Sequence, residues 1–239
     1  PISITAANSE ALANARVDNV SNIQAISPSV SFRVTNIATS SANLIIRGLG
    51  TTGNSRSFEG SVGVFIDGVY RTRAAAALQN FLDIDNLQVL RGPQGTLFGR
   101  NTPAGVVKFE SEKPNLKKVE GYYNASWGTH NTVNLEGAVN VPLSDKWAMR
   151  VSTLRQHRDD FVNNYSDLAK TNKTGELDGY NEHAERVQFL YTPDSTFSAL
   201  FNVHQRTTSG SARLFRANLI KKGSADIVDG YDLNSIVTN

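Results

Sequence analysis

The feature that most constrains this chain is the regular alternation of apolar and polar residues after Pro114. Residues 119–127 alternate in this way, and the same two-residue period recurs over 133–141, 147–152, 187–191 and 197–203. Successive side chains of a β-strand point to opposite faces of its sheet. The pattern therefore predicts five strands in an up-and-down antiparallel meander with one apolar face, with a slip in phase expected at Leu154.

The connections and strand ends bear on which kind of meander this is. Turns at 142–146 and 193–195 are short, whereas 159–183 is a polar stretch of about 25 residues. Transmembrane β-barrels have short turns at one end, long loops at the other and aromatic girdles, positions suited to Trp127, Trp147 and Tyr191. A ten-residue strand tilted by ~45° rises about 23 Å, close to their ~25 Å apolar band. A soluble β-sandwich shows the same alternation, so the pattern alone leaves both architectures open.

Composition excludes several other classes. No apolar run approaches the ~18 residues of a spanning helix, and cysteine is absent, so helical membrane proteins and disulfide or thiolate sites are excluded. A net charge of +2 gives no indication of a nucleic-acid partner. The histidines are scattered and no nucleophile elbow is present, so we predict no metal site, no cofactor and no enzymatic activity. The histidines are His130, His157, His183 and His204.

Residues 1–114 have a different pattern, with short β-branched runs between glycine-rich turns. Strands are expected at 1–5, 29–34, 44–47, 62–67, 69–71, 87–91 and 106–110. Helices are expected at 10–16, capped by Ser9, and at 18–26 and 78–82. The sequence GLGTTG at 48–53 fits a dinucleotide fingerprint, but no helical period follows it, so nucleotide binding is not expected. This part is predicted to be a small α+β unit.

The order of motifs in this chain resembles a known family. PISITA, LIIRGLG, VGVFIDGVY and LQVLRGPQGTLFGRNTPAGVV, followed by alternating strands, are similar to the plug and first barrel strands of TonB-dependent outer-membrane receptors. The long LRGPQGTLFGRNTPAG run is the specific part. The resemblance implies an α+β plug domain over 1–115, then antiparallel transmembrane β-barrel strands over 116–239. Five strands cannot close a barrel, and the segment that contacts TonB precedes such a plug, so we expect the chain to be part of a larger protein.

The resemblance also implies a function. Such a receptor sits in the outer membrane of a Gram-negative bacterium, binds a scarce ligand, above all a ferric siderophore, and admits it to the periplasm when TonB moves the plug. The implied partners are TonB, outer-membrane lipid and the ferric chelate. Uptake of another large solute, such as an oligosaccharide, a cobalamin or an aromatic compound, is an alternative. A soluble α+β and β-sandwich binding module is the alternative from another class.

The resemblance assigns roles to individual residues. Arg47 and Arg91 are similar to plug arginines that pair with glutamates of later wall strands, so replacing either by alanine is expected to loosen plug docking. The turns at 51–60, 71–77 and 97–103 correspond to plug apices that face the ligand. Their cationic, aromatic and polar residues are Arg56, Phe58, Arg71, Arg73, Phe98, Arg100 and Asn101. The residues expected to shape the turns are Gly48, Gly50, Gly68, Gly92, Pro93, Gly95 and Gly99.

Overall fold

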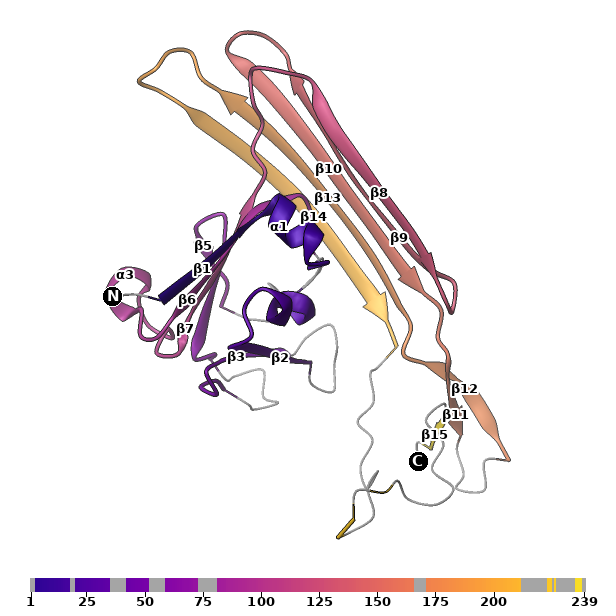
Figure 1. Ribbon diagram of the computed structural model, residues 1–239. Helices are drawn as coiled ribbons and strands as arrows, with labels where there is room; N and C mark the ends of the chain where they lie inside the picture. The colour runs from indigo at the N-terminus through magenta and orange to yellow at the C-terminus, as the bar shows by residue number, and fades with distance from the viewer. Residues whose placement is uncertain are drawn as a thin grey trace.

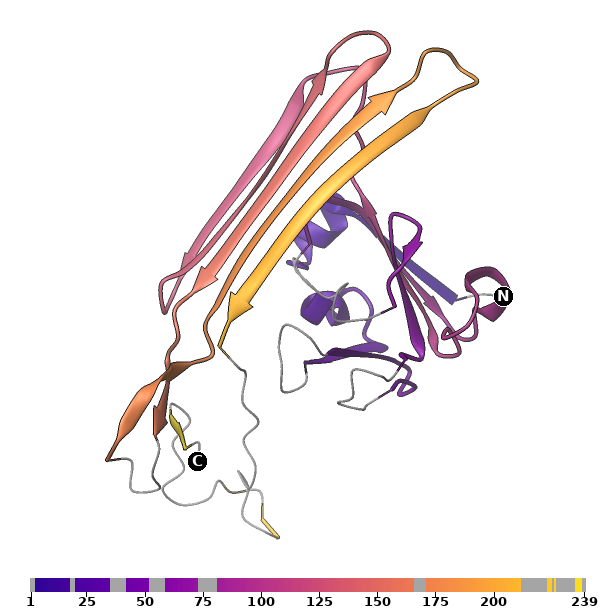
Figure 2. The ribbon, with the colours of Figure 1, turned by 180° about the vertical axis from the view of Figure 1, so that it is seen from behind.

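Two five-stranded sheets make up most of the described structure. The computed structural model describes residues 3–17, 20–34, 42–51, 59–72, 81–165, 171–211, 223–224, 226 and 235–237. Figures 1 and 2 show a compact N-terminal unit lying against one face of a long, inclined sheet. The end of the long sheet with the short turns extends well beyond the N-terminal unit (Figure 1).

The N-terminal unit is built on a sheet with the strand order β1-β6-β7-β4-β5. Its strands are β1 (Ser3–Asn8), β4 (Val62–Ile66), β5 (Val69–Tyr70), β6 (Ile84–Arg91) and β7 (Gly105–Ser111). β4 runs parallel to β7, while the other pairs are antiparallel. A hairpin of β2 (Val30–Val34) and β3 (Ala42–Ile46), the helices α1 (Ser9–Asn14) and α3 (Gly95–Phe98), and the 3₁₀-helix η1 (Val20–Ala25) complete the unit.

The helices of this unit differ in detail from the sequence expectation. The N-cap of α1 is Asn8, not Ser9, because the Asn8 side chain accepts a hydrogen bond of 2.9 Å from the Ala11 N–H. The helix expected over 18–26 is the 3₁₀-helix η1. The helix expected over 78–82 falls mainly on residues 73–80, which lie outside the described residues.

A continuous apolar core stabilises the N-terminal unit. β6 and β7 lie in the middle of the sheet, and their β-branched and aliphatic side chains are buried together with those of η1 and β2. Leu87, Val89, Val107, Ile23 and Val30 are each almost or completely inaccessible to solvent. Burying a side chain of this size stabilises a fold by roughly 1.5–3 kcal/mol. The core therefore holds β6 in place, together with Phe81, which precedes it.

The long sheet confirms the predicted meander, with the order β14-β13-β10-β9-β8. Its strands are β8 (Glu120–Gly128), β9 (Thr132–Pro142), β10 (Trp147–Arg158), β13 (Tyr180–Tyr191) and β14 (Ala199–Gly210). Each pairs antiparallel with the next in the sheet. β10, β13 and β14 continue beyond the alternating stretches of the sequence, because polar residues occupy both faces near one end.

The two faces of the long sheet decide between a sandwich and a barrel wall. The face turned away from the N-terminal unit carries large apolar side chains, and Tyr123, Trp127 and Val203 are 69%, 79% and 74% exposed. The face turned toward that unit buries polar residues, among them Arg150 and Gln188. A soluble sandwich would bury the apolar face instead. The sheet is part of a barrel wall, with its apolar face outward and its polar face inward.

Leu154 corrects the expectation of a slip in phase. The pairing of β10 with β9 and with β13 is continuous through this residue. Leu154 lies on the inner face, where it packs with Leu82 and Ala184 in a small buried cluster. An apolar residue on the polar face interrupts the alternation of the sequence without interrupting the strand.

The two ends of the long sheet also differ. At the end with the short turns, the Trp147 and Tyr191 rings stack with centroids 4.3 Å apart. The stretch 159–183 holds two short strands, β11 (Val162–Tyr165) and β12 (Lys173–Leu177), and the first residues of β13. β15 (Ser235–Val237) pairs parallel with β11, so the chain after β14 returns to the same excursion (Figure 1). None of the helices in the described residues has the length and apolar character needed to cross a membrane.

Candidate functional site

A buried ion pair joins the N-terminal unit to the inner face of the long sheet. Asp83, the residue before β6, accepts hydrogen bonds from Arg150 Nε at 2.7 Å and Arg150 Nη2 at 2.6 Å. Ser152 Oγ donates a third hydrogen bond to the same carboxylate. The Arg150 and Asp83 side chains are only 5% and 2% exposed. A bidentate pair of this kind is strong and directional, so it defines where the two parts meet.

The backbone conformation and backbone hydrogen bonds of Asp83 orient its side chain toward Arg150. Its φ of +51° is in the left-handed region, which Asp and Asn tolerate better than most residues. Its carbonyl accepts a 2.9 Å hydrogen bond from the Glu112 N–H, which fixes the corner between β7 and β6. The Asp83 N–H donates to Glu136 Oε1 at 3.0 Å, and Tyr122 Oη donates to the same oxygen at 2.8 Å. Asp83 therefore uses its side chain, its N–H and its carbonyl in this corner.

Other inner-face side chains hold the segments on either side of Asp83. Arg186 Nη1 donates to the Leu82 carbonyl at 2.9 Å, and Gln188 Nε2 donates to the Glu112 carbonyl at 2.8 Å. These contacts come from β13, whereas Arg150 is in β10. Two neighbouring strands of the wall therefore form hydrogen bonds with both chain segments at this corner, the one before β6 and the one after β7.

The connector between the two sheets is held in the same way. Asn140 in β9 is completely buried. Its Oδ1 accepts from the Asn115 N–H at 2.9 Å, and its Nδ2 donates to the carbonyls of Asn115 and Lys118 at 3.0 and 2.8 Å. One amide side chain thus satisfies three backbone groups, which is how buried polar groups are normally accommodated.

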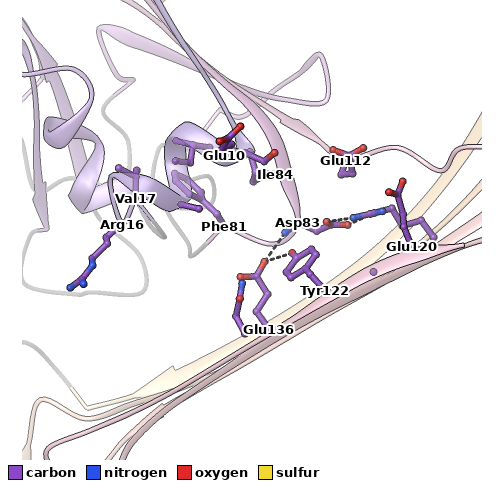
Figure 3. A pocket seen from close by; sticks show the side chains of 16 residues that line it. Glu10, Arg16, Val17, Phe81, Asp83, Ile84, Glu112, Glu120, Tyr122 and Glu136 are labelled. Carbon is purple, nitrogen blue, oxygen red and sulfur yellow. Dashed lines mark hydrogen bonds and ion pairs between the residues drawn. The ribbon is translucent and has the colours of Figure 1, made fainter. Parts of the chain in front are cut away.

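A cavity of about 820 Å³ lies next to the Asp83–Arg150 pair (Figure 3). It lies between α1 and the inner face of β8 and β9. The charged residues that line it are Glu10, Arg16, Asp83, Glu112, Glu120, Glu136 and Arg150. Five carboxylates against two guanidiniums make the lining acidic, although several of these carboxylates already hold partners. Among the described residues, no group of three or more His, Cys, Asp or Glu side chains is arranged to hold a metal ion.

Glu112, which lies in the connector between the two sheets, is a cavity carboxylate with a raised pKa. Burial raises the pKa of Glu112, and the negative charges of Asp85 and Asp83 raise it further, while the positive charge of Arg150 opposes the shift. The ionised form of Glu112 is therefore disfavoured in the folded protein.

Arg91 lies inside the N-terminal unit and contacts four hydroxyl groups. Its Nε donates to Ser29 Oγ at 2.7 Å, and its Nη2 donates to Thr5 Oγ1 at 2.6 Å and Ser27 Oγ at 2.9 Å. Nη1 donates to Ser3 Oγ at 3.2 Å. The guanidinium ties β1 to the turn before β2. Among the described residues it makes no contact with the long sheet, so its pairing with a later wall strand stays a prediction.

Arg47 is exposed and follows β3 with a φ of +53°. Its N–H donates to the Ser29 carbonyl at 2.8 Å. No ion pair of its side chain occurs within the described part of the chain. Its role as a latch likewise stays a prediction.

The structure describes only some of the residues that were expected to face the ligand. Arg56, Phe58 and Arg73 lie outside the described residues. Arg71 follows β5 and is half-buried.

The turn at 97–103 is held to Glu59. Arg100 Nη2 and Asn101 Nδ2 donate to the Glu59 carboxylate at 3.0 and 2.8 Å. Phe98 packs edge-to-face on Phe65, with ring centroids 5.1 Å apart. The structure therefore brings three of the expected residues together around one carboxylate and one ring.

The expected turn residues have distinct geometries. Gly48, Gly68, Gly92 and Gly99 have φ between +77° and +87°, which favours glycine. Gly50 is required for space, since a Cβ there would lie 2.8 Å from the Leu44 carbonyl oxygen. Gly95 begins α3 with open space around it, and Pro93 is exposed just before it.

Sequence reasoning missed the residues that join the two parts. Asp83 and Asp85 both lie in the run FLDIDNLQ at 81–88, and nothing in that run distinguishes one from the other. Arg150 is one of many polar residues on an alternating strand. A usable signal was present in the arginine itself, because a large cation within the inner face of a barrel strand requires a partner.

The comparisons with known proteins agree with this architecture. Residues 1–106 match the family model described as TonB-dependent Receptor Plug Domain. This part of the chain is therefore a plug domain of the kind found in TonB-dependent receptors. The ferrioxamine receptor of Yersinia enterocolitica is 24% identical over 152 residues, which is 61% of this chain and 19% of that protein. The pesticin receptor of Yersinia pestis is 25% identical over 100 residues, which is 42% of this chain and 15% of that protein. The chain thus spans less than a fifth of these relatives.

Solved structures show the same fold. The ferric yersiniabactin uptake receptor FyuA from Yersinia pestis superposes with a TM-score of 0.78 at 20% identity, over 88% of this chain and 32% of that one. The pyoverdine outer membrane receptor FpvA from Pseudomonas aeruginosa gives a TM-score of 0.67 at 16% identity, over 88% of this chain and 29% of that one. By this likeness in fold, the N-terminal sheet corresponds to the plug sheet and the long sheet corresponds to a part of the barrel wall.

Proposed function

We propose that the receptor is an outer-membrane, TonB-dependent active transporter that binds a ferric siderophore and admits it to the periplasm by movement of the plug. The boundary between plug and wall would fall in the connector near residue 115. The receptor would act by binding and conformational change, with TonB as its energy-coupling partner and without chemistry on its cargo.

The single observation that carries the proposal is the polar contact between plug and wall. Asp83 and Arg150 join the two parts through a buried pair, while the outer face of the same wall carries exposed apolar residues. A plug held to an otherwise polar lumen by a few localised contacts can leave or rearrange without exposing a large apolar core. That is the behaviour a gated transporter requires.

The relatives support the choice of cargo. The similar proteins include a ferrioxamine receptor, a ferric yersiniabactin uptake receptor and a pyoverdine receptor, and all three are named for iron chelates or their uptake. The copper transporter OprC has the same fold with a TM-score of 0.59, so the architecture is not restricted to one cargo.

A deletion experiment in the native bacterium tests the proposal. Cells lacking the full-length gene should lose uptake of radiolabelled iron from at least one class of chelate under iron limitation. The complete gene should restore uptake, and removal of TonB should abolish it again. Unchanged uptake of hydroxamate, catecholate and mixed chelates in the deletion strain would contradict an iron-transport function.

A further inference from the structure

Arg150 uses one edge of its guanidinium to hold the plug. Its Nε and Nη2 donate to the two carboxylate oxygens of Asp83, at 2.7 and 2.6 Å. Its third nitrogen, Nη1, forms no hydrogen bond within the described part of the chain, and Arg150 also lines the cavity beside the pair. A guanidinium presents N–H donors along more than one edge of its planar fork, so its other edge can bind a second carboxylate.

The pairing of the wall strands places Glu120 in line with Arg150. Arg150 lies opposite Asn140 of β9, and Asn140 lies opposite Glu120 of β8. Directly opposed residues point their side chains to the same face of a sheet, so all three face inward. Because neighbouring strands lie ~4.8 Å apart, the Cα atoms of Arg150 and Glu120 are about 10 Å apart, which their extended side chains can span. Both residues line the same cavity, in which Figure 3 labels Glu120.

Glu120 is also better placed than the other carboxylates on the inner face. In the described wall strands these are Glu136 and Glu182, which lie in the rows of Leu154 and Gln156, further along β10. Glu136 already accepts a hydrogen bond from Tyr122 Oη, and Glu182 pairs with Arg206. Glu120 is therefore the wall carboxylate nearest to Arg150 in the sheet.

The present partners of Glu120 leave it able to change partner. Lys118 Nζ lies 2.7 Å from Glu120 Oε2, but the Lys118 side chain is 68% exposed, so solvent screens this pair and it contributes little. Asn115 Nδ2 donates to the other oxygen, Oε1. Between Glu120 and Arg150, Asn140 is completely buried and holds the connector to the wall. This part of the wall therefore stays covered when the corner at Asp83 moves.

We propose that Glu120 accepts the Arg150 guanidinium when Asp83 leaves with the plug. A guanidinium that loses its carboxylate in an enclosed site is costly, whereas transfer to a second carboxylate keeps its charge compensated. Because Glu120 and Arg150 belong to one sheet, their separation does not depend on the position of the plug. The transfer lowers the free energy of the undocked state. Its use during transport rests on the proposed function, whereas transfer on spontaneous undocking does not.

Hydrogen exchange of the full-length receptor in detergent tests the transfer. The amide of Asp83 is a direct probe, because its N–H donates to Glu136 Oε1 of the wall only while the plug is docked. Glu120→Gln removes the charge that stabilises the undocked state, so exchange at this amide should slow by roughly tenfold, the factor that corresponds to ~1.4 kcal/mol. A residue that merely supports the docked fold has the opposite effect, because its loss accelerates exchange.

Two further variants make the test specific. Glu10→Gln is the matched control, because Glu10 lines the same cavity from α1 but does not lie in the row of Arg150, and exchange should be unchanged. In an Arg150→Gln background, Glu120→Gln should have no effect, because the guanidinium is absent. Unchanged or faster exchange in Glu120→Gln alone would overturn the proposal, and so would an equal slowing in the Arg150→Gln background.

A crystal structure of the Asp83→Asn receptor shows the transfer directly. Arg150 should lie within hydrogen-bonding distance of the Glu120 carboxylate, because asparagine carries no charge to retain it. Arg150 still directed at residue 83, with Glu120 paired only to Lys118, would contradict the transfer.

Uptake measurements separate the transfer from the proposed function. Cells that carry Glu120→Gln should bind a ferric chelate as the wild type does but take it up several-fold more slowly. If exchange slows in Glu120→Gln but the receptor transports no ferric chelate, the transfer stands and the transport proposal fails. Normal uptake together with slowed exchange would overturn the role of the transfer in transport.

Discussion

Replacing Asp83 by asparagine should release the plug from the first strands of the wall. The substitution removes the negative charge that Arg150 and Ser152 share, while it keeps the size of the side chain. Asparagine also tolerates the left-handed backbone of this position, where φ is +51°. The change therefore tests the ion pair and not the backbone.

The expected magnitude follows from burial. Both partners are at least 95% buried, with side-chain exposures of 5% and 2%, so solvent screening is weak. Breaking such a pair costs about 3–5 kcal/mol, because an uncompensated charge stays in the interior. Since ~1.4 kcal/mol is a factor of ten, the fraction of undocked plug should rise by roughly 10²–10³-fold. Arg150→Gln should have a similar effect, and the double variant should cost less than the sum of the two.

Hydrogen exchange and limited proteolysis of the full-length receptor measure this equilibrium. Exchange at the amides of β6 should accelerate in Asp83→Asn, and plug cleavage should become faster in proportion. Asp145→Asn is the control, since it makes the same chemical change in the exposed turn between β9 and β10. Equal exchange in Asp83→Asn and the control, or strict additivity in the double variant, would refute the reasoning.

Four further substitutions have definite expected outcomes. Glu112→Gln should stabilise the plug near neutral pH. Because the pKa of Glu112 is raised in the folded protein, its contribution to the free energy of unfolding is complete only at low pH and is lost as pH rises through the folded-state pKa. Thermal unfolding should therefore show a higher Tm for Glu112→Gln near neutral pH, and this difference should vanish on acidification. Gly105→Ala should lower Tm sharply, since a Cβ would lie 2.4 Å from the Leu90 carbonyl oxygen, whereas Gly95→Ala, with open space, should change stability by under about 1 kcal/mol. Arg91→Ala should expose β1 to proteolysis ahead of the rest of the plug, and unchanged cleavage would contradict this.

The strands of both sheets could largely be predicted from the sequence, for a local reason. Strand faces follow from a two-residue period, and turns follow from glycine and proline, so β8 and β9 were predicted near their observed positions. Only the first part of β14 was predicted, because the alternation ends before the strand does. The first half of β13 was missed because Asn181, His183 and Glu185 are polar on the outer face as well. Leu154 misled the pattern because its apolar neighbour, Leu82, is distant in the chain.

The sequence by itself determined which residues of each wall strand share a face, because alternation assigns the two faces of a strand without reference to any partner. Which of these faces points outward was decided by the structure. Only the tertiary structure decided that Arg150 meets Asp83, 67 residues away, and that Arg186 donates a hydrogen bond to the Leu82 carbonyl. A polar side chain on the inner face is specified by local pattern, but its partner depends on which corner of the plug the connector brings to that face. The contacts that hold the plug are therefore a property of docking geometry, which no local sequence signal encodes.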